Sequence, residues 1–171
     1  MRDIKVLFLD IDGVLINRSC FGPGIPSGFR SKPDPDCIAR LNRITDTTGA
    51  VIVVSSTWRI MPFMELKETL ISWGITAKIM DVTPRLETAK GDITLSVPRG
   101  REIKAWIARN DWRNITAVCI LDDDSDMEHM ADKLIQTQFT YGLQDEHVAR
   151  AIRMLNETPT KNVQPVIGVR S

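Results

Sequence analysis

Hydrophobic and polar positions follow two different periods along this chain, and the changes of period divide it into strands and helices. Short runs of apolar, often β-branched residues are typical of buried strands, whereas apolar residues spaced three or four positions apart are typical of helices with one buried face. The runs that predict strands are 4–10, 50–56, 76–82, 115–124 and 136–141. The patterns that predict helices are 34–49, 61–74, 101–110, 127–135 and 144–157.

Three segments show neither period. Residues 17–33 are dense in glycine, proline and serine, which predicts a loop that forms a mobile flap over the site. Residues 83–100 contain proline and glycine and are expected to be irregular. The sequence contains no internal repeat and no linker, so we expect one folded domain over residues 1–158 and a loose tail at 159–171.

The alternation of strands with helices predicts an α/β fold. In such folds a parallel sheet, here of about five strands, lies between two layers of helices in a Rossmann-like arrangement. Ligands bind to these sheets at the carboxyl ends of the strands. Side chains that follow the predicted strands are therefore the first candidates for a functional site.

Composition excludes several classes of protein. The 171 residues include 22 Lys and Arg against 22 Asp and Glu, so no overall basic field would attract nucleic acid, although a local patch remains open. The three cysteines are far apart and odd in number, which argues against a disulfide framework and for a reducing compartment. The chain shows neither an apolar run as long as a membrane span nor a signal-peptide pattern, so we expect a cytoplasmic protein.

Three of the predicted strands end in groups that can carry chemistry. Asp10 and Asp12 follow the first strand, Ser55 and Ser56 follow the second, and the acidic run 122–124 follows the fourth. Carboxylates that converge at one point repel each other, and Mg²⁺ relieves such repulsion while bridging to phosphate oxygens. A serine hydroxyl and a basic side chain would then hold the remaining phosphate oxygens.

The first acidic pair suggests a reaction. One carboxylate can attack phosphorus and form an aspartyl-phosphate, while the other protonates the leaving oxygen and later activates water. A lone Asp-x-Asp-Gly sequence is more often a turn. Here the pair Asp10 and Asp12 follows a buried strand and is joined by two further motifs in order, which favours a site.

The motifs "DIDGV" (10–14), "VIVVSS" (51–56) and "CILDDD" (119–124) resemble those of the haloacid dehalogenase (HAD) superfamily of phosphohydrolases. The resemblance implies that Asp10 is the nucleophile and that Asp12 is the general acid and base, with its backbone carbonyl on the metal. It also implies that Ser55 binds phosphate, a role that Ser56 could take instead, and that Asp122 and Asp123 bind Mg²⁺ together with Asp10. The second acid of the first motif points to phosphate-ester hydrolysis.

A narrower likeness covers most of the chain. The segments "SSTWR" (55–59), "TPRL" (83–86), "RGREIKAWI" (99–107) and "YGLQDEHVARAIRML" (141–155) are similar to small HAD domains grouped with RNA-repair proteins. That grouping implies a polynucleotide-end phosphatase. The third HAD motif is ambiguous, because Arg99, Arg101 and Lys104 compete for the phosphate-binding role, and the narrower pattern favours Arg99.

The spacing of the motifs leaves no room for a large folded cap, so we expect an open site that can accept a large substrate. The resulting hypothesis is a Mg²⁺-dependent phosphomonoesterase that acts on nucleic-acid ends, with a small-molecule or nucleotide phosphatase as the alternative. A non-catalytic phosphate-binding module is a second alternative. Trp58 directly follows the serines of the second motif, and both core packing and base stacking are open to it.

Overall fold

The computed structural model describes residues 2–90 and 93–157, and the predicted tail lies outside the described residues. A sheet of five parallel strands in the order β3-β2-β1-β6-β7 forms its centre, as the sequence predicts. The strands are β1 (Asp3–Leu9), β2 (Val51–Val54), β3 (Ile79–Val82), β4 (Glu87–Lys90), β5 (Ile93–Ser96), β6 (Asn114–Asp122) and β7 (Leu134–Gln136). The helices are α1 (Pro35–Thr48), α2 (Phe63–Ser72), α3 (Arg99–Arg109) and α4 (Asp145–Asn156).

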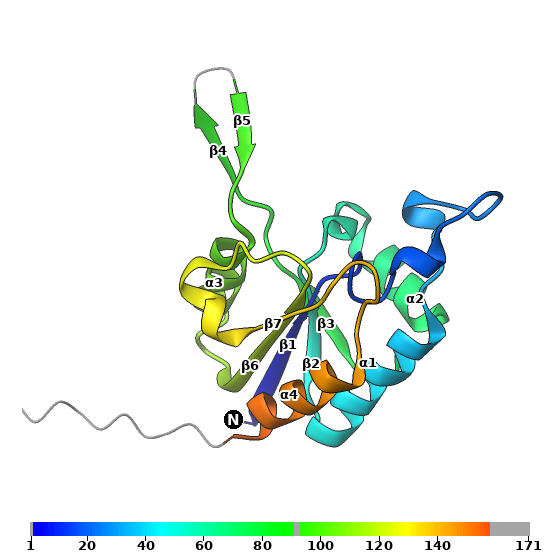
Figure 1. Ribbon diagram of the computed structural model, residues 1–171. Coiled ribbons are helices and arrows are strands. Elements are labelled where there is room, and N and C mark those ends of the chain that lie inside the picture. The colour runs from blue at the N-terminus through cyan, green and yellow to red at the C-terminus, as the bar shows by residue number, and fades with distance from the viewer. Residues whose placement is uncertain (1, 91–92, 158–171) are drawn as a thin grey trace, which may run out of the picture.

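Helices cover both faces of the sheet, as Figure 1 shows. Alternate residues of β1 point to opposite faces, so Leu7 and Leu9 belong to the core beneath α1, α2 and α4, whereas Phe8 belongs to the core beneath α3. There Phe8 packs edge-on against Trp106 with ring centroids 5.5 Å apart. The buried faces of the helices therefore hold the central strands in a three-layer arrangement.

The pairing register aligns the ends of the three central strands. Leu9, the last residue of β1, lies opposite Val54 of β2 and Leu121 of β6. The next residue of each strand therefore lies in one row at the carboxyl edge of the sheet. Two backbone hydrogen bonds continue the pairing past the strand ends, from Asp10 N to Leu121 O and from Ser55 N to Leu9 O, both at 2.9 Å.

Two of the element predictions are wrong. The segment 127–135 is a short 3-10 turn, Glu128–Lys133, followed by strand β7, and not one helix. Leu134 and Ile135 pair with Ile120 and Leu121 of β6, so sheet pairing outweighs their helix-like spacing. The last strand consequently lies at Leu134–Gln136 instead of 136–141.

The segment expected to be irregular, 83–100, contains an antiparallel hairpin of β4 and β5. The hairpin projects from the same end of the sheet at which the parallel strands finish (Figure 1). It pairs with no strand of the main sheet among the described residues. Helix α3 also begins earlier than predicted, at Arg99, so that Arg99 lies in its first turn.

The structure also shows how large the inserted segments are and whether a described helix could span a membrane. Within residues 2–90 and 93–157 the segments inserted near the strand ends are this hairpin and the loop 17–33, which carries two 3-10 turns, and neither is a large cap domain. None of the described helices has the length and apolar character needed to cross a bilayer.

Candidate active site

Three carboxylates meet at the carboxyl edge of the sheet. Asp10 directly follows β1, and Asp122 and Asp123 lie at and after the end of β6, the strand that pairs with β1. One carboxylate oxygen from each lies within 4.8 Å of the others. Asp10 is 6% exposed and Asp122 is fully buried, so little water is available to screen their charges.

Burial and mutual repulsion disfavour charge on this carboxylate cluster. Burial raises the pKa of Asp10 well above its ordinary value, the charge of Asp122 adds to the rise, and the Arg99 guanidinium opposes it. Burial likewise raises the pKa of Asp122 to about 6, again against the opposing effect of Arg99. Burial also raises the pKa of Asp123. A bound cation would stabilise all three as carboxylates.

Arg99 supplies one positive charge at the centre of the cluster. Its Nη1 lies 3.4 Å from Asp10 Oδ1 and 3.4 Å from Asp122 Oδ2, and the same nitrogen donates to the backbone carbonyl of Ser55. Burial disfavours the guanidinium charge, but the Asp10 and Asp122 carboxylates outweigh that effect and raise the pKa of Arg99. Arg99 is therefore a fixed cation that joins all three strand ends.

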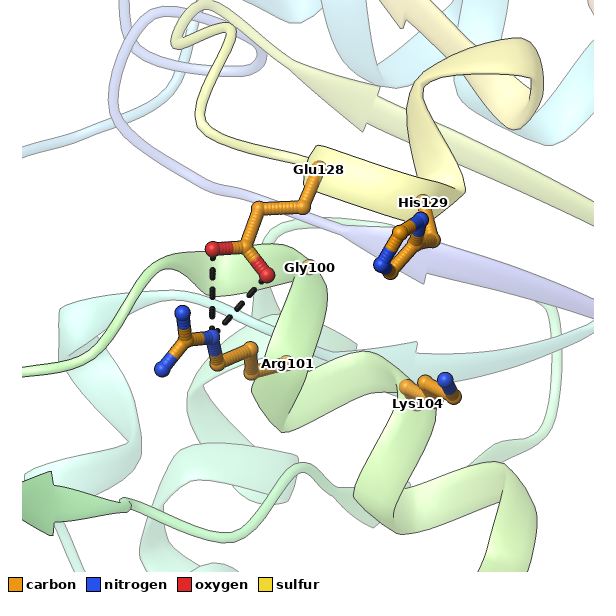
Figure 2. A pocket seen from close by; sticks show the side chains of 5 residues that line it. All are labelled: Gly100, Arg101, Lys104, Glu128 and His129. Carbon is orange, nitrogen blue, oxygen red and sulfur yellow. Dashed lines mark hydrogen bonds and ion pairs between the residues drawn. The ribbon is translucent and has the colours of Figure 1, made fainter.

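The other two candidates for the basic position lie elsewhere. Figure 2 shows that Arg101 reaches Glu128, and its Nε lies 2.9 Å from Glu128 Oε2 on the protein surface. Lys104 lines the same surface pocket, of about 270 Å³, next to His129. The structure therefore brings only Arg99, among the three basic residues named from the sequence, to the carboxylate cluster.

The two serines that follow β2 have different environments. Ser56 caps the 3-10 turn Thr57–Ile60, where its Oγ accepts a hydrogen bond from Trp58 N at 3.3 Å. Ser55 is fully buried, and its Oγ has no hydrogen-bond partner among the described residues. A buried hydroxyl without a partner is costly, so Ser55 is the serine with an unused donor beside the site.

Gly13 allows the first motif to approach the acidic segment after β6. Its φ of +80° is a conformation that side chains other than glycine rarely adopt. A Cβ at this position would lie 2.2 Å from Cγ of Asp123, so the Asp123 carboxylate occupies the space that a side chain would need. The glycine of the motif thus sets the position of a candidate metal ligand.

Asp12 lies outside the carboxylate cluster, although it is only two residues from Asp10. Its Oδ2 accepts a hydrogen bond of 3.0 Å from Nε1 of Trp58. Trp58 is 2% exposed, which excludes base stacking on its ring faces in this conformation and confirms core packing. The sequence analysis noted Trp58 because it follows the motif serines, but it did not predict the contact with Asp12. That contact forms because the chain turns back toward Asp12 after β2.

A buried ion pair also escaped the sequence analysis. Arg59 Nη2 lies 2.5 Å from Glu102 Oε2, and both side chains are at least nine-tenths buried. Glu102 Oε1 also accepts a hydrogen bond of 3.0 Å from the backbone N of Leu86. The pair therefore ties the segment after β2 and the segment before the hairpin to α3, the helix that carries Arg99.

A cleft of about 440 Å³ shares Arg99 with the carboxylate cluster, although Asp10, Asp122 and Asp123 do not line it. Arg99 lines it from the cluster side, and the half-exposed Phe29 of the loop 17–33, together with the exposed Ile60 and Arg85, lines it further out. The cleft therefore presents an apolar surface together with both basic and acidic side chains, and it meets the carboxylate cluster at Arg99.

The residues present fit a Mg²⁺ ion. Mg²⁺ prefers oxygen ligands, and Asp10, Asp122 and Asp123 offer three carboxylates. Asp122 Oδ2 is buried and has no hydrogen-bond partner in the described structure, because its 3.4 Å contact with Arg99 lacks hydrogen-bond geometry. A cation would satisfy that oxygen and reduce the repulsion within the cluster.

Comparisons with known proteins agree with the fold. No curated protein sequence matches the chain. The fold is similar to the HAD domain of the effector protein Lem4 from Legionella pneumophila, solved as an inactive mutant, with a TM-score of 0.56 and 14% sequence identity over 91% of this chain and 96% of that one. The family model for the HAD domain in Swiss Army Knife RNA repair proteins matches residues 6–148. The chain therefore belongs to this family of HAD domains.

Proposed function

We propose that this protein is a Mg²⁺-dependent phosphomonoesterase that works through an aspartyl-phosphate on Asp10. The observation that carries the proposal is the convergence of Asp10, Asp122 and Asp123 around Arg99, which also lines an open cleft. Membership of the HAD superfamily supports phosphatase chemistry in general.

In the proposed reaction a carboxylate oxygen of Asp10 attacks phosphorus, and the bond from phosphorus to the leaving oxygen breaks. Asp12 gives its proton to that leaving oxygen. A water molecule then attacks the phosphorus of the aspartyl-phosphate and gives a proton to Asp12, which releases inorganic phosphate and restores both carboxyl groups.

The surrounding residues would bind and orient the phosphate. Arg99 and the hydroxyl of Ser55 would donate to its oxygens, and the unused donor of Ser55 supports that assignment over Ser56. Asp10, Asp122, Asp123 and the backbone carbonyl of Asp12 would hold Mg²⁺, which supplies charge stabilisation for the transferring phosphoryl group.

For the substrate we propose a phosphorylated nucleic-acid end. The support is the family to which the chain belongs, together with a cleft that no large cap covers in the described part of the chain. A small-molecule or nucleotide phosphatase is the alternative, since Phe29 and Arg85 in the lining of the cleft would also suit the base and phosphates of a free nucleotide. A reducing, cytoplasmic location is proposed because Cys20, Cys37 and Cys119 are all unpaired.

A substrate panel tests the proposal. Oligonucleotides with 5′- or 3′-phosphates, mononucleotides, sugar phosphates and an aryl phosphate would be compared in Mg²⁺ and in EDTA. We expect Mg²⁺-dependent phosphate release, and a loss on the order of 10³-fold or more in Asp10→Asn. Asp132→Asn, at an exposed site, is the control. An Asp10→Asn protein that keeps more than about a tenth of the activity would exclude Asp10 as the nucleophile, and no release from any ester would leave only the phosphate-binding module.

Metal dependence gives a separate measurement. We expect Asp122→Ala to raise the Mg²⁺ concentration needed for half-maximal rate and to reduce the thermal shift caused by Mg²⁺. Unchanged Mg²⁺ titrations of Asp122→Ala and Asp123→Ala would show that the acids after β6 are not ligands.

A further inference from the structure

We infer that Trp58 is a positioning residue for the reaction, because its indole N–H determines which oxygen of Asp12 can transfer the proton. This inference rests on the proposed function, in which Asp12 is the general acid and base. The carrying observation is the hydrogen bond of 3.0 Å from Trp58 Nε1 to Asp12 Oδ2.

The backbone around Trp58 is fixed from both directions. Its N–H donates to Ser56 Oγ at 3.3 Å, and its carbonyl accepts from Met61 N at 3.0 Å, so the 3-10 turn Thr57–Ile60 is closed at both ends. The turn follows β2 directly, and β2 pairs with the strand that precedes Asp12. Trp58 and Asp12 therefore start from neighbouring strand ends.

The ring of Trp58 is held by two aromatic neighbours. Phe29 packs edge-on against it with centroids 5.2 Å apart, and Trp73 does the same at 5.3 Å. Edge-to-face packing of this kind restricts rotation of a buried ring. The orientation of the indole N–H is consequently fixed, and it points at Asp12 Oδ2.

The chemistry of an indole makes this contact directional. Its N–H is a donor and cannot accept, so Oδ2 of Asp12 must be an acceptor whether Asp12 is charged or neutral. The carbonyl oxygen of a neutral carboxyl is a better acceptor than its hydroxyl oxygen, so the contact favours the placement of the Asp12 proton on Oδ1. In the first step the Oδ1–H bond breaks and the proton goes to the leaving oxygen, and in the second step Oδ1 takes a proton from the attacking water.

A residue with only a packing role would behave differently. Replacing Trp58 with Phe would then lower stability and reduce the rate by the same factor for every ester. A residue that positions the general acid must matter most when the leaving oxygen needs a proton, because a good leaving group departs without one. The dependence on the leaving group separates the two roles.

The test compares Trp58→Phe with Trp73→Phe, which removes another indole from the same aromatic contact. Trp73 is half-buried and its indole makes no hydrogen bond to the described residues. For Trp58→Phe we expect a loss of about 10- to 100-fold on an alkyl phosphate and of less than about 3-fold on p-nitrophenyl phosphate. For Trp73→Phe we expect equal factors on both esters. Equal factors for Trp58→Phe would overturn the inference.

A double-mutant cycle tests whether Trp58 acts through Asp12. In an Asp12→Asn background the proton transfer is already lost, so adding Trp58→Phe should cause no further leaving-group-dependent loss. A full additional loss on the alkyl ester would overturn the inference. If the parent protein hydrolyses no ester, both the proposed function and the positioning role of Trp58 are refuted. If the parent is active and Trp58→Phe lowers the rate by the same factor on both esters, only the positioning role is refuted.

A spectroscopic measurement covers the case in which Trp58→Phe does not fold. In ¹⁵N-labelled protein with Mg²⁺, the indole N–H resonance of Trp58 should shift and exchange faster with solvent in Asp12→Ala, while that of Trp73 stays unchanged. Identical Trp58 resonances in the parent and in Asp12→Ala would overturn the contact on which the inference depends.

Discussion

Asp122 allows the electrostatic cost of the carboxylate cluster to be measured. Burial raises the pKa of its carboxyl from 3.8 to about 6 on folding. A group whose pKa is raised in the folded state adds stability that is fully present below about 3.8 and is lost as the pH rises through about 6. Without a bound metal, Asp122 should therefore contribute a loss of stability between about pH 5 and about pH 7.5.

The size of the effect follows from the same two pKa values. Linkage between them gives a change on the order of 1 kcal/mol in the free energy of unfolding from about pH 5 to about pH 7.5. For a chain of this length that corresponds to about 2–4 °C in Tm. Asp122→Asn cannot titrate, and it also removes the charge that raises the pKa of Asp10, so the parent should lose at least about that amount of stability relative to this variant.

The assay is urea unfolding of both proteins in EDTA at the two pH values. His147 works in the opposite direction, because burial lowers its pKa, but it is present in both proteins and cancels in the difference. Any constant effect of the amide beside Arg99 also cancels between the two pH values. A difference in unfolding free energy that is the same at both pH values would refute the argument that burial keeps Asp122 from ionising.

Two further predictions use pairs of matched variants. Gly13→Ala should abolish activity and the stabilising effect of Mg²⁺, because the new Cβ displaces Asp123. The control Gly49→Ala, with φ +72° and open space around it, should lose only about 1–2 kcal/mol of stability and keep the response to Mg²⁺. Equal thermal shifts with Mg²⁺ in the two variants would contradict this prediction. Glu102→Gln should cost on the order of 3 kcal/mol in unfolding free energy, because it leaves the buried guanidinium of Arg59 without its charged partner. The control Glu128→Gln removes an exposed ion pair and should cost less than about 1 kcal/mol. Similar losses in urea unfolding would show that burial does not distinguish the two ion pairs.

The sheet and its row of strand-end acids could be predicted because both depend on local signals. Apolar runs that end in Asp10, Ser55 and Asp122 indicate the strands, and the parallel order then brings their ends together. Arg99 was one of three candidates until the structure showed that helix α3 begins with it and directs it to the cluster.

The features that were missed depend on contacts between distant segments. The spacing in 127–135 is as compatible with a helix as with a turn and a strand, and only pairing of Leu134 with Ile120 decides between them. The first strand of the hairpin, Glu87–Lys90, has no alternating pattern, and the alternation in Ile93–Ser96 covers only four residues, which is too short to indicate a hairpin. The contacts of Trp58 with Asp12 and of Arg59 with Glu102 join residues more than 40 positions apart, for which no local period exists.

The β4–β5 hairpin is structurally independent of the carboxylate cluster, so the size of substrate that is accepted can be changed separately from the reactive groups. Its strands pair with each other and with no other described strand, and the carboxylate cluster uses none of its residues. The segment between Leu86 and Val97 can therefore be shortened to a tight turn, or exchanged for a longer insert, while the sheet and its acids keep their positions. Under the proposed function, a set of such chimaeras should hydrolyse the same small ester and differ in the size of ester that they accept, because Ser96 of the hairpin lines the cleft.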